Sequence, residues 1–189
     1  QNPVTFEDVH FNGNVLTLGS ASTHLKVNDN LTLAGIALET GAGSLTLSGA
    51  LALTDNASLN SSGGTITLKS GGTSTGSVVS LPGTTLVLEN PLSLTGTTLK
   101  TNGTTFTTNA NALSLSNSSI LEVEGVQDLS GVLPDNSTTL RLAANSTIND
   151  NASLSVGTLE LADNILTLDD QMAGLSITQL VTLDAAGEQ

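Results

Sequence analysis

Apolar and polar residues alternate along this chain in short runs, and the commonest run is the triplet Leu-x-Leu. Such triplets occupy residues 45–47, 51–53, 66–68, 86–88 and 92–94, the third of these beginning with Ile. Residues two apart in a strand point to the same face, so each triplet predicts a short strand with two inward apolar side chains. The gaps between triplets hold Gly, Asn, Ser, Asp and Pro, which favour turns.

The pattern recurs at a fixed period between positions 59 and 106. Three sets of residues mark it: Gly63, Gly83 and Gly103; Thr65, Thr85 and Thr105; Leu59, Val79 and Leu99. Such a period indicates a solenoid, whose repeats bury their apolar faces only by stacking. Barrels and sandwiches, the alternative all-β folds, need no such period. We therefore predict an all-β, right-handed, single-stranded parallel β-helix with about 20 residues per coil.

The same pattern predicts the domain organisation and the core. Residues 1–15 form an N-terminal cap or a partial coil, 16–120 form coils, 121–139 form an irregular insertion with a short helical turn, and 140–189 form further coils and the C-terminal end. The triplets beginning at Leu16, Leu31 and Leu45 follow one another at shorter steps than the later ones, which indicates uneven coils and argues against a left-handed hexapeptide helix. The polar run at 69–77 predicts a loop or bulge. We expect inward side chains at Leu45, Leu47, Leu59, Ile66, Leu68, Val79, Leu86, Leu88 and Leu99.

Composition and charge narrow the function classes. The chain has no Cys, only 2% aromatic residues and a net charge of −13 with four cationic residues. Nucleic-acid binding needs clustered Lys and Arg, and an anionic membrane surface would repel this chain. Eleven of the 17 acids fall in residues 121–189, which is typical of a solvated acidic surface. No apolar stretch approaches the ~18 residues of a membrane span, and the start at Gln1 without a leader indicates a mature protein or a piece of a longer one.

The sequence offers few residues that could act in catalysis. Asp169 and Asp170 form an adjacent acid pair, but neighbours in a strand point to opposite faces, so we interpret them as turn residues. His10 and His24 lie far from any nucleophile and, without Cys or a paired His, supply neither a triad nor a zinc site. We predict no catalytic residue, no cofactor-binding residue, no metal site and no enzyme activity.

Three weaker signals stay open. Asp150, Asp163, Asp169 and Asp170 offer oxygen ligands for Ca²⁺ in Asn-rich turns, although the calcium β-roll nonapeptide is absent. The row of Thr65, Thr85 and Thr105 could order water against ice. Asn-x-Ser/Thr sequons start at Asn30, Asn56, Asn60, Asn102, Asn117, Asn136, Asn145 and Asn151, and turn chemistry explains them as well as glycosylation does.

The Leu-Thr-Leu, Leu-Ala-Leu and Leu-Ser-Leu triplets, the Asn/Gly/Ser turns and the lack of Cys resemble the passenger regions of bacterial surface adhesins, both autotransporters and filamentous-haemagglutinin-like exoproteins. Phe11-Asn12-Gly13-Asn14 is also similar to the F-x-x-N motif of chlamydial polymorphic membrane proteins, although its companion motif is missing. The resemblance implies a non-catalytic adhesive rod, displayed extracellularly or at the bacterial outer membrane.

The partner implied is a host or surface receptor, either protein or glycan. Self-association of the rod, end to end or side by side, stays open. The alternatives are a glycan-binding module and a polysaccharide-active enzyme, both weakened because sugar sites usually stack rings on Trp or Tyr, which this chain lacks.

Overall fold

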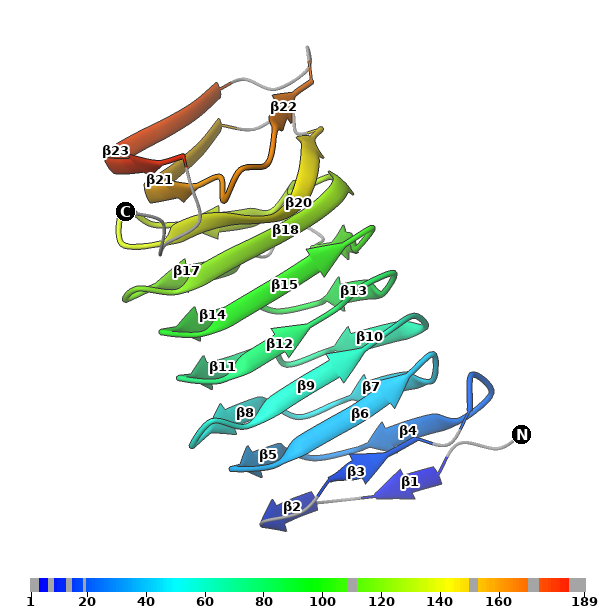
Figure 1. Cartoon of the computed structure of the whole chain (residues 1–189). Helices are drawn as coiled ribbons and strands as arrows, with labels where there is room; N and C mark the ends of the chain where they lie inside the picture. Colours follow the sequence, from blue (N-terminus) through cyan, green and yellow to red (C-terminus); the bar gives the residue numbers. More distant parts are fainter. Residues whose placement is uncertain are drawn as a thin grey trace.

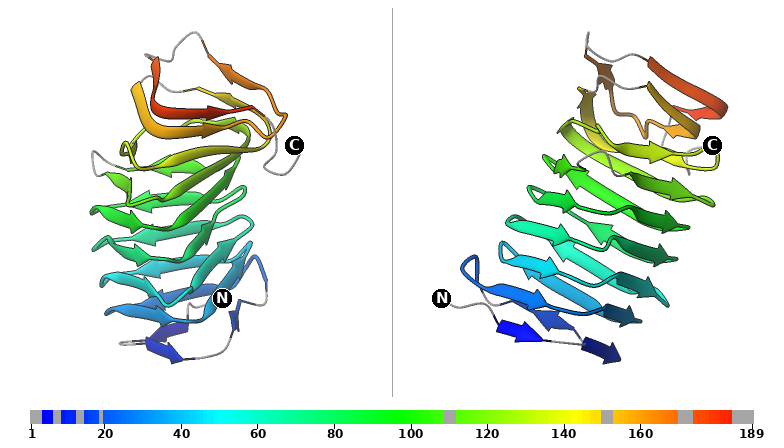
Figure 2. Two further views of the ribbon diagram at one scale, coloured as in Figure 1. Left: turned by 60° about the vertical axis from the view of Figure 1, so that its left-hand side comes forward. Right: turned by 180° about the vertical axis from the view of Figure 1, so that it is seen from behind.

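Parallel strands wind into a right-handed β-solenoid in the computed structural model of this chain (Figure 1). The structure describes residues 4–6, 9–12, 15–18, 20–108, 112–149, 153–169 and 174–183. About eight coils of roughly 20 residues stack along one axis, and no helix interrupts them in the described ranges. At ~4.8 Å per coil the rod is about 40 Å long. Figure 2 shows the same stack from two further sides. The fold class predicted from the period is confirmed.

Each full coil contributes one strand to each of three sheets, which we name A, B and C. Sheet A contains β1 (Val4–Phe6), β4 (His24–Val27), β7 (Ser44–Leu47), β10 (Thr65–Leu68), β13 (Thr85–Leu88) and β16 (Thr105–Thr107). Sheet B contains β2 (Val9–Asn12), β5 (Leu31–Ala34), β8 (Leu51–Thr54), β11 (Gly72–Thr75), β14 (Leu92–Thr95), β17 (Leu113–Ser116) and β19 (Val132–Pro134). Sheet C contains β3 (Leu16–Thr17), β6 (Ala37–Gly41), β9 (Ser58–Ser61), β12 (Val78–Ser80), β15 (Thr98–Asn102), β18 (Ile120–Gln127), β20 (Thr139–Ile148), β21 (Ser153–Glu160) and β23 (Gly174–Thr182), with β22 (Leu166–Leu168) pairing with β20.

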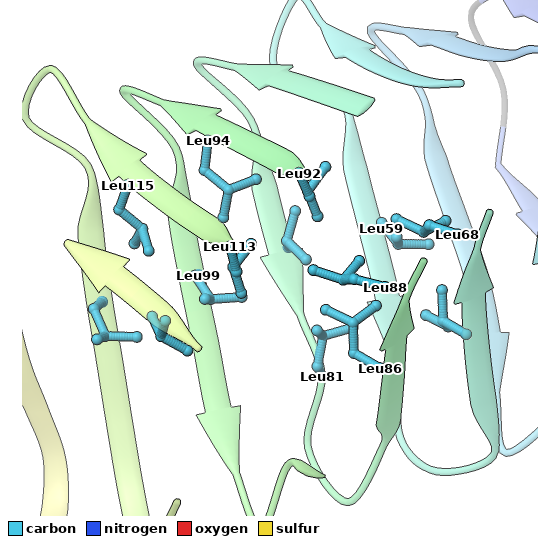
Figure 3. Close-up of a cluster of buried hydrophobic side chains, with 14 of the residues drawn as sticks. Leu59, Leu68, Leu81, Leu86, Leu88, Leu92, Leu94, Leu99, Leu113 and Leu115 are labelled. Atoms are coloured by element: carbon cyan, nitrogen blue, oxygen red, sulfur yellow. The ribbon is translucent and has the colours of Figure 1, made fainter. Parts of the chain in front are cut away.

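The leucine rows form the core. Because the strands pair in parallel and in register, equivalent residues of successive coils stack: Ile66 lies opposite Leu86, and Leu86 opposite Phe106. All nine side chains predicted to point inward are buried, with at most 2% of their surface exposed. Figure 3 shows leucines from neighbouring coils packed against one another inside the stack. Burying a leucine stabilises the fold by roughly 1.5–3 kcal/mol, and this continuous column repeats that gain in every coil.

Left-handed backbone closes the corner between sheets B and C. Gly35, Gly76 and Gly96 each have φ near +60°, and two other coils use a pair of such residues, Asp55-Asn56 or Asn117-Ser118. The residue after each turn points inward. In four successive coils this residue is a buried hydroxyl side chain: Ser77, Thr97, Ser119 and Thr138. The first three donate to a carbonyl of their own turn, at 3.0, 3.2 and 2.7 Å, so the polar atoms are satisfied inside the core.

The predicted unevenness of the early coils is wrong. The shorter steps between triplets compare β3, β5 and β7, which belong to three different sheets. Within sheet A, Leu25 pairs with Leu45 and Leu45 with Ile66, so the early coils already have the full length of the later ones. All three sides carry Leu-x-Leu triplets, which is why the sequence pattern did not separate them.

The predicted loop at 69–77 is also wrong, because β11 occupies 72–75. Gly72 lies in register between Leu51 and Leu92, and Ser74 takes a leucine position in the row. The buried Ser74 hydroxyl forms a hydrogen bond with the Thr97 hydroxyl at 3.0 Å. A strand inside a solenoid needs only backbone pairing and a filled interior, and small residues meet both needs here.

Strands of the solenoid occupy most of the predicted irregular insertion at 121–139. Ile120–Gln127 forms β18, which pairs with β15 and β20, and Val132–Pro134 forms β19 on β17. The acidic residues that suggested an insertion, Glu122 and Glu124, sit on the outer face of β18 opposite Lys100 and Asn102. Among the described residues of this segment none is helical.

The second part of the chain winds differently from the first. Sheet A ends at β16, and beyond it β18, β20, β21 and β23 are long strands of 8 to 10 residues. The register shifts within these strands, between Val123 and Gly125 and between Val156 and Thr158. A bulge of this kind bends a strand, so one strand covers two sides of the coil where two strands and a turn did so earlier.

Within the predicted cap or partial coil at 1–15, the described segments 4–6 and 9–12 are strands of the first coil. β1, β2 and β3 pair with β4, β5 and β6, which places Phe6 and Phe11 on different sheets. Within the described residues, no helix is long and apolar enough to cross a membrane.

Candidate functional site

A row of charged and amide side chains runs along the outer face of sheet C. In register order its members are Glu39, Asn60, Ser80, Lys100, Glu122, Arg141 and Glu160. The Asn60 amide donates to Glu39 at 2.7 Å. Lys100 Nζ lies 3.0 Å from Glu122 Oε1, and the Arg141 guanidinium lies 3.9 Å from Glu122 and 2.6 Å from Glu160. These contacts link neighbouring coils in two stretches of the row, Glu39 with Asn60 and Lys100 through Glu160.

Two adjacent hollows open beside this charged row, at the corner where the chain leaves sheet C. One has a volume of about 120 Å³ and is lined by Ser80, Pro82, Lys100, Thr101, Asn102, Glu122, Glu124 and Ala143. The other has a volume of about 200 Å³ and is lined by Glu39, Gly41, Asn60, Ser61, Ser62, Ser80 and Pro82. Ser80 and Pro82 belong to both, so the two hollows form one shallow polar groove along the rod axis.

The chemistry of this groove suits a ligand rich in hydroxyl groups. Carboxylates at Glu39, Glu122 and Glu124 accept hydrogen bonds, while Lys100 donates, and Asn102 can do both. Pro82 offers an apolar ring between the two halves. The ion pair between Lys100 and Glu122 holds a hydrogen-bond donor beside an acceptor. This arrangement suits two neighbouring hydroxyl groups of one ligand. The groove is open, so it positions polar groups without excluding water.

The structure does not bring the sequence candidates for catalysis together. Asp169 is exposed beyond β22, and Asp170 lies outside the described residues. His24 is exposed at the start of β4, and the side chain of His10 is not among those described. Asp163 is exposed in a turn with φ +63°, and Asp150 is undescribed. Among the described residues, no three His, Cys, Asp or Glu side chains are grouped so that they could hold a metal ion.

The threonine row predicted on sheet A is in register. Thr65 pairs with Thr85 and Thr85 with Thr105, all with outward side chains. The neighbouring outward row holds Thr67, Val87 and Thr107, so the face is a mixed surface of threonine and valine.

Most of the predicted sequon asparagines lie on the surface, mainly at corners. The exposed ones are Asn30, Asn56, Asn102, Asn117, Asn136 and Asn145, whereas Asn60 is half-buried and bonded to Glu39, and Asn151 lies outside the described residues. Asn56 and Asn117 have φ of +60° and +51°, so the left-handed turn explains their residue type. The Asn30 side chain accepts from the Ala50 amide of the next coil at 2.8 Å.

The Asp135 carboxyl has a shifted pKa, and the cause is local. Partial burial acts to raise the pKa of Asp135, but hydrogen bonds from Ser137 and Thr138 outweigh that effect and lower it. The Ser137 amide donates to Asp135 Oδ1 at 2.8 Å and the Thr138 hydroxyl at 3.2 Å. The carboxylate closes the corner between β19 and β20, which is a structural role.

Sequence reasoning missed the charged row. Its members change residue type from coil to coil, so they form no repeated motif in the sequence. The signal that could have revealed them is the coil period itself, since Ser80 and Lys100 sit one coil apart on one face, as do Arg141 and Glu160. That signal becomes readable only when each triplet has been assigned to its sheet.

No family model, curated protein or solved structure matches this chain. The resemblance to adhesin passengers therefore rests on the triplets, turns and composition described above.

Proposed function

We propose that this chain is a non-catalytic structural and adhesive rod of a secreted or surface-displayed bacterial protein. The observation that carries the proposal is the continuous ladder of sheet C, which runs from β3 through every coil to β23. Main-chain hydrogen bonds along the axis make such a stack stiff, and stiffness lets a rod hold a contact surface away from its point of attachment. Its place would be outside the cell or at the outer membrane.

The surface of the rod supports the same proposal. The outer rows of its three sheets carry Thr, Ser, Asn and short charged ladders, so polar faces are available for contact with a receptor. The leucine column is sealed inside for most of the length and adds no apolar patch to those faces. The net charge of −13 favours solubility of the rod and opposes non-specific contact between its sides.

Surface display tests the adhesive role. The chain is fused to a carrier on cells that do not adhere, and attachment to host-cell layers, extracellular-matrix proteins and abiotic surfaces is counted under flow. We expect attachment to rise at least tenfold over carrier alone on one of these surfaces. The Leu86→Asp variant, in which the stack is broken, serves as the misfolded control. Attachment equal to carrier alone on every surface would contradict the proposal.

Glycan binding is a second candidate, favoured by the polar groove beside the charged row. The groove juxtaposes Lys100, Glu122 and Asn102 around a hollow of about 120 Å³. The observation concerns one face only, and the other two sheets play no part in it.

An oligosaccharide array and calorimetry test this candidate. We expect binding by wild type and a loss of at least tenfold in affinity in Lys100→Ala and Asn102→Ala. Lys26→Ala, which removes a lysine from the outer face of sheet A, is the matched control and should bind as wild type does. Equal binding by all three variants would exclude the groove as the site.

A further inference from the structure

The last coil concentrates the exposed apolar side chains of the rod. Among the described residues 165–169 and 174–183, five large hydrophobic side chains are exposed: Ile165, Leu168, Leu180, Val181 and Leu183. Val181 lies in register with the buried Leu159, which in turn pairs with the buried Leu140, yet 46% of Val181 is exposed. Leu183 follows it and is 66% exposed. The inner row therefore continues into the last coil and ends uncovered.

The same coil presents an open strand edge. β23 is the terminal strand of sheet C, and its Thr182 carbonyl accepts from the amide of Leu161, the residue after β21, at 2.9 Å. In a parallel ladder the two backbone groups of one residue point to the same neighbour, so those of Val181 point away from β21. Among the described residues no strand pairs with this side of β23. An apolar row beside such an edge is the surface on which one coil receives the next.

The first coil has the complementary edge. β1, β2 and β3 are the terminal strands of sheets A, B and C, and all run in the same sense as the strands they pair with. Leu18 of the first coil donates its amide to Glu39 at 2.8 Å, which leaves the backbone groups of Thr17 directed outward. Val4, Val9 and Leu16 hold register positions opposite the core leucines Leu25, Leu31 and Leu38.

The strand order of the two ends matches. In the last turn, β22 is followed by β23. The part of β23 before its register shift forms the next side of the coil, and the part after the shift extends sheet C. The first coil runs β1, β2, β3 over the corresponding three sides. A molecule stacked on the last coil would continue both the strand direction and the coil-to-coil interface already present inside the rod.

We propose that the last coil receives the first coil of a second copy of this chain, so that molecules associate head to tail. The junction joins two different surfaces, and such heterologous contacts produce open filaments because nothing closes them into a ring. The net charge of −13 opposes the approach of two copies, and exposed Asp163 and Asp169 lie at the receiving end. Added salt screens this repulsion, with a Debye length of ~10 Å at 0.1 M, so association strengthens with ionic strength.

Sedimentation of wild type and three variants tests the junction. Val181→Asp places a charge in the receiving row, and Thr17→Pro removes an outward amide from β3 without breaking its bond to β6. Val126→Asp is the matched control, because Val126 is 61% exposed on the side of the rod. Circular dichroism and thermal melting confirm that each variant is folded.

Wild type and Val126→Asp should grow in average mass with protein concentration and with salt. Val181→Asp alone and Thr17→Pro alone should stay monomeric, while their mixture should form dimers and nothing larger, since each contributes one intact end. A wild type that stays monomeric at every salt concentration would overturn the proposal. Dimers formed by Thr17→Pro alone would overturn it as well, because they would show the receiving ends joining to each other.

Discussion

The coils of residues 20–108 and those of residues 112–183 enclose the apolar core in different ways. In the first region short strands alternate with left-handed turns, and the core column of leucines is sealed on every side. In the second, long bent strands replace pairs of strands, sheet A is lost, and large apolar side chains reach the surface. Because the inner rows are buried in both regions as far as Leu159, the interior is closed equally well by turns between short strands and by bends within long ones.

The largest expected contrast comes from one substitution placed in each region. Leu86→Asp buries a carboxylate between stacked coils with no partner, so we expect the free energy of unfolding to fall by more than about 4 kcal/mol. Leu183→Asp occupies the uncovered end of the row and should change it by less than about 0.5 kcal/mol. Urea denaturation followed by circular dichroism measures both. Comparable losses would mean that the last coil is covered.

Gly72 tests how closely the backbones approach in the first region. A Cβ at this position would meet the Leu51 carbonyl oxygen at 2.4 Å and the Leu51 Cβ at 2.8 Å. We expect Gly72→Ala to destabilise the fold by about 1–3 kcal/mol, since overpacking forces the backbone to move. Thr73→Ala, on the exposed face of the same strand, is the control and should have little effect. A melting temperature unchanged in Gly72→Ala would show that the two coils are further apart.

Buried polar side chains distinguish the regions more finely. Ser74 in the first region is paired with Thr97, whereas the fully buried Gln127 in the second donates to the Glu124 carbonyl but leaves its Oε1 without a partner. We expect Gln127→Met to raise the free energy of unfolding by about 1 kcal/mol, because an unpaired buried acceptor is costly. Ser74→Ala should lower it by a similar amount. Destabilisation by Gln127→Met would indicate that a bound molecule satisfies the amide.

The smallest expected effect is the dependence of stability on acidic pH. The folded pKa of Asp135 is lowered relative to the unfolded chain, so its hydrogen bonds stabilise the fold fully above the unfolded value, near 3.8. This contribution is lost as the pH falls through the lower folded pKa. Asp135→Asn should therefore reduce the melting temperature slightly at pH 6, and the difference from wild type should shrink below pH 3. A difference that grows on acidification would contradict the assigned hydrogen bonds.

The sequence predicts the solenoid because its apolar residues obey two periods at once, one within each strand and one from coil to coil. It mislocates the early coils because Leu31 and Leu45 look alike while lying on different sheets. It misses β11 because Gly72 and Ser74 break the apolar rule without breaking the backbone ladder. The charged row escapes for a related reason: Lys100, Glu122 and Arg141 share a position but no chemistry, so only the register brings them together.

The corner between sheets B and C has a consequence for how such a chain changes during evolution. A single Gly at 35, 76 or 96 and a residue pair at 55–56 or 117–118 close the same corner. The strands on either side keep their register, since Leu33 still faces Leu53 and Leu38 still faces Leu59 across the added residue. One codon can therefore be gained or lost at this corner without a shift in the strand ladder, and whole coils can be duplicated between corners of unequal length.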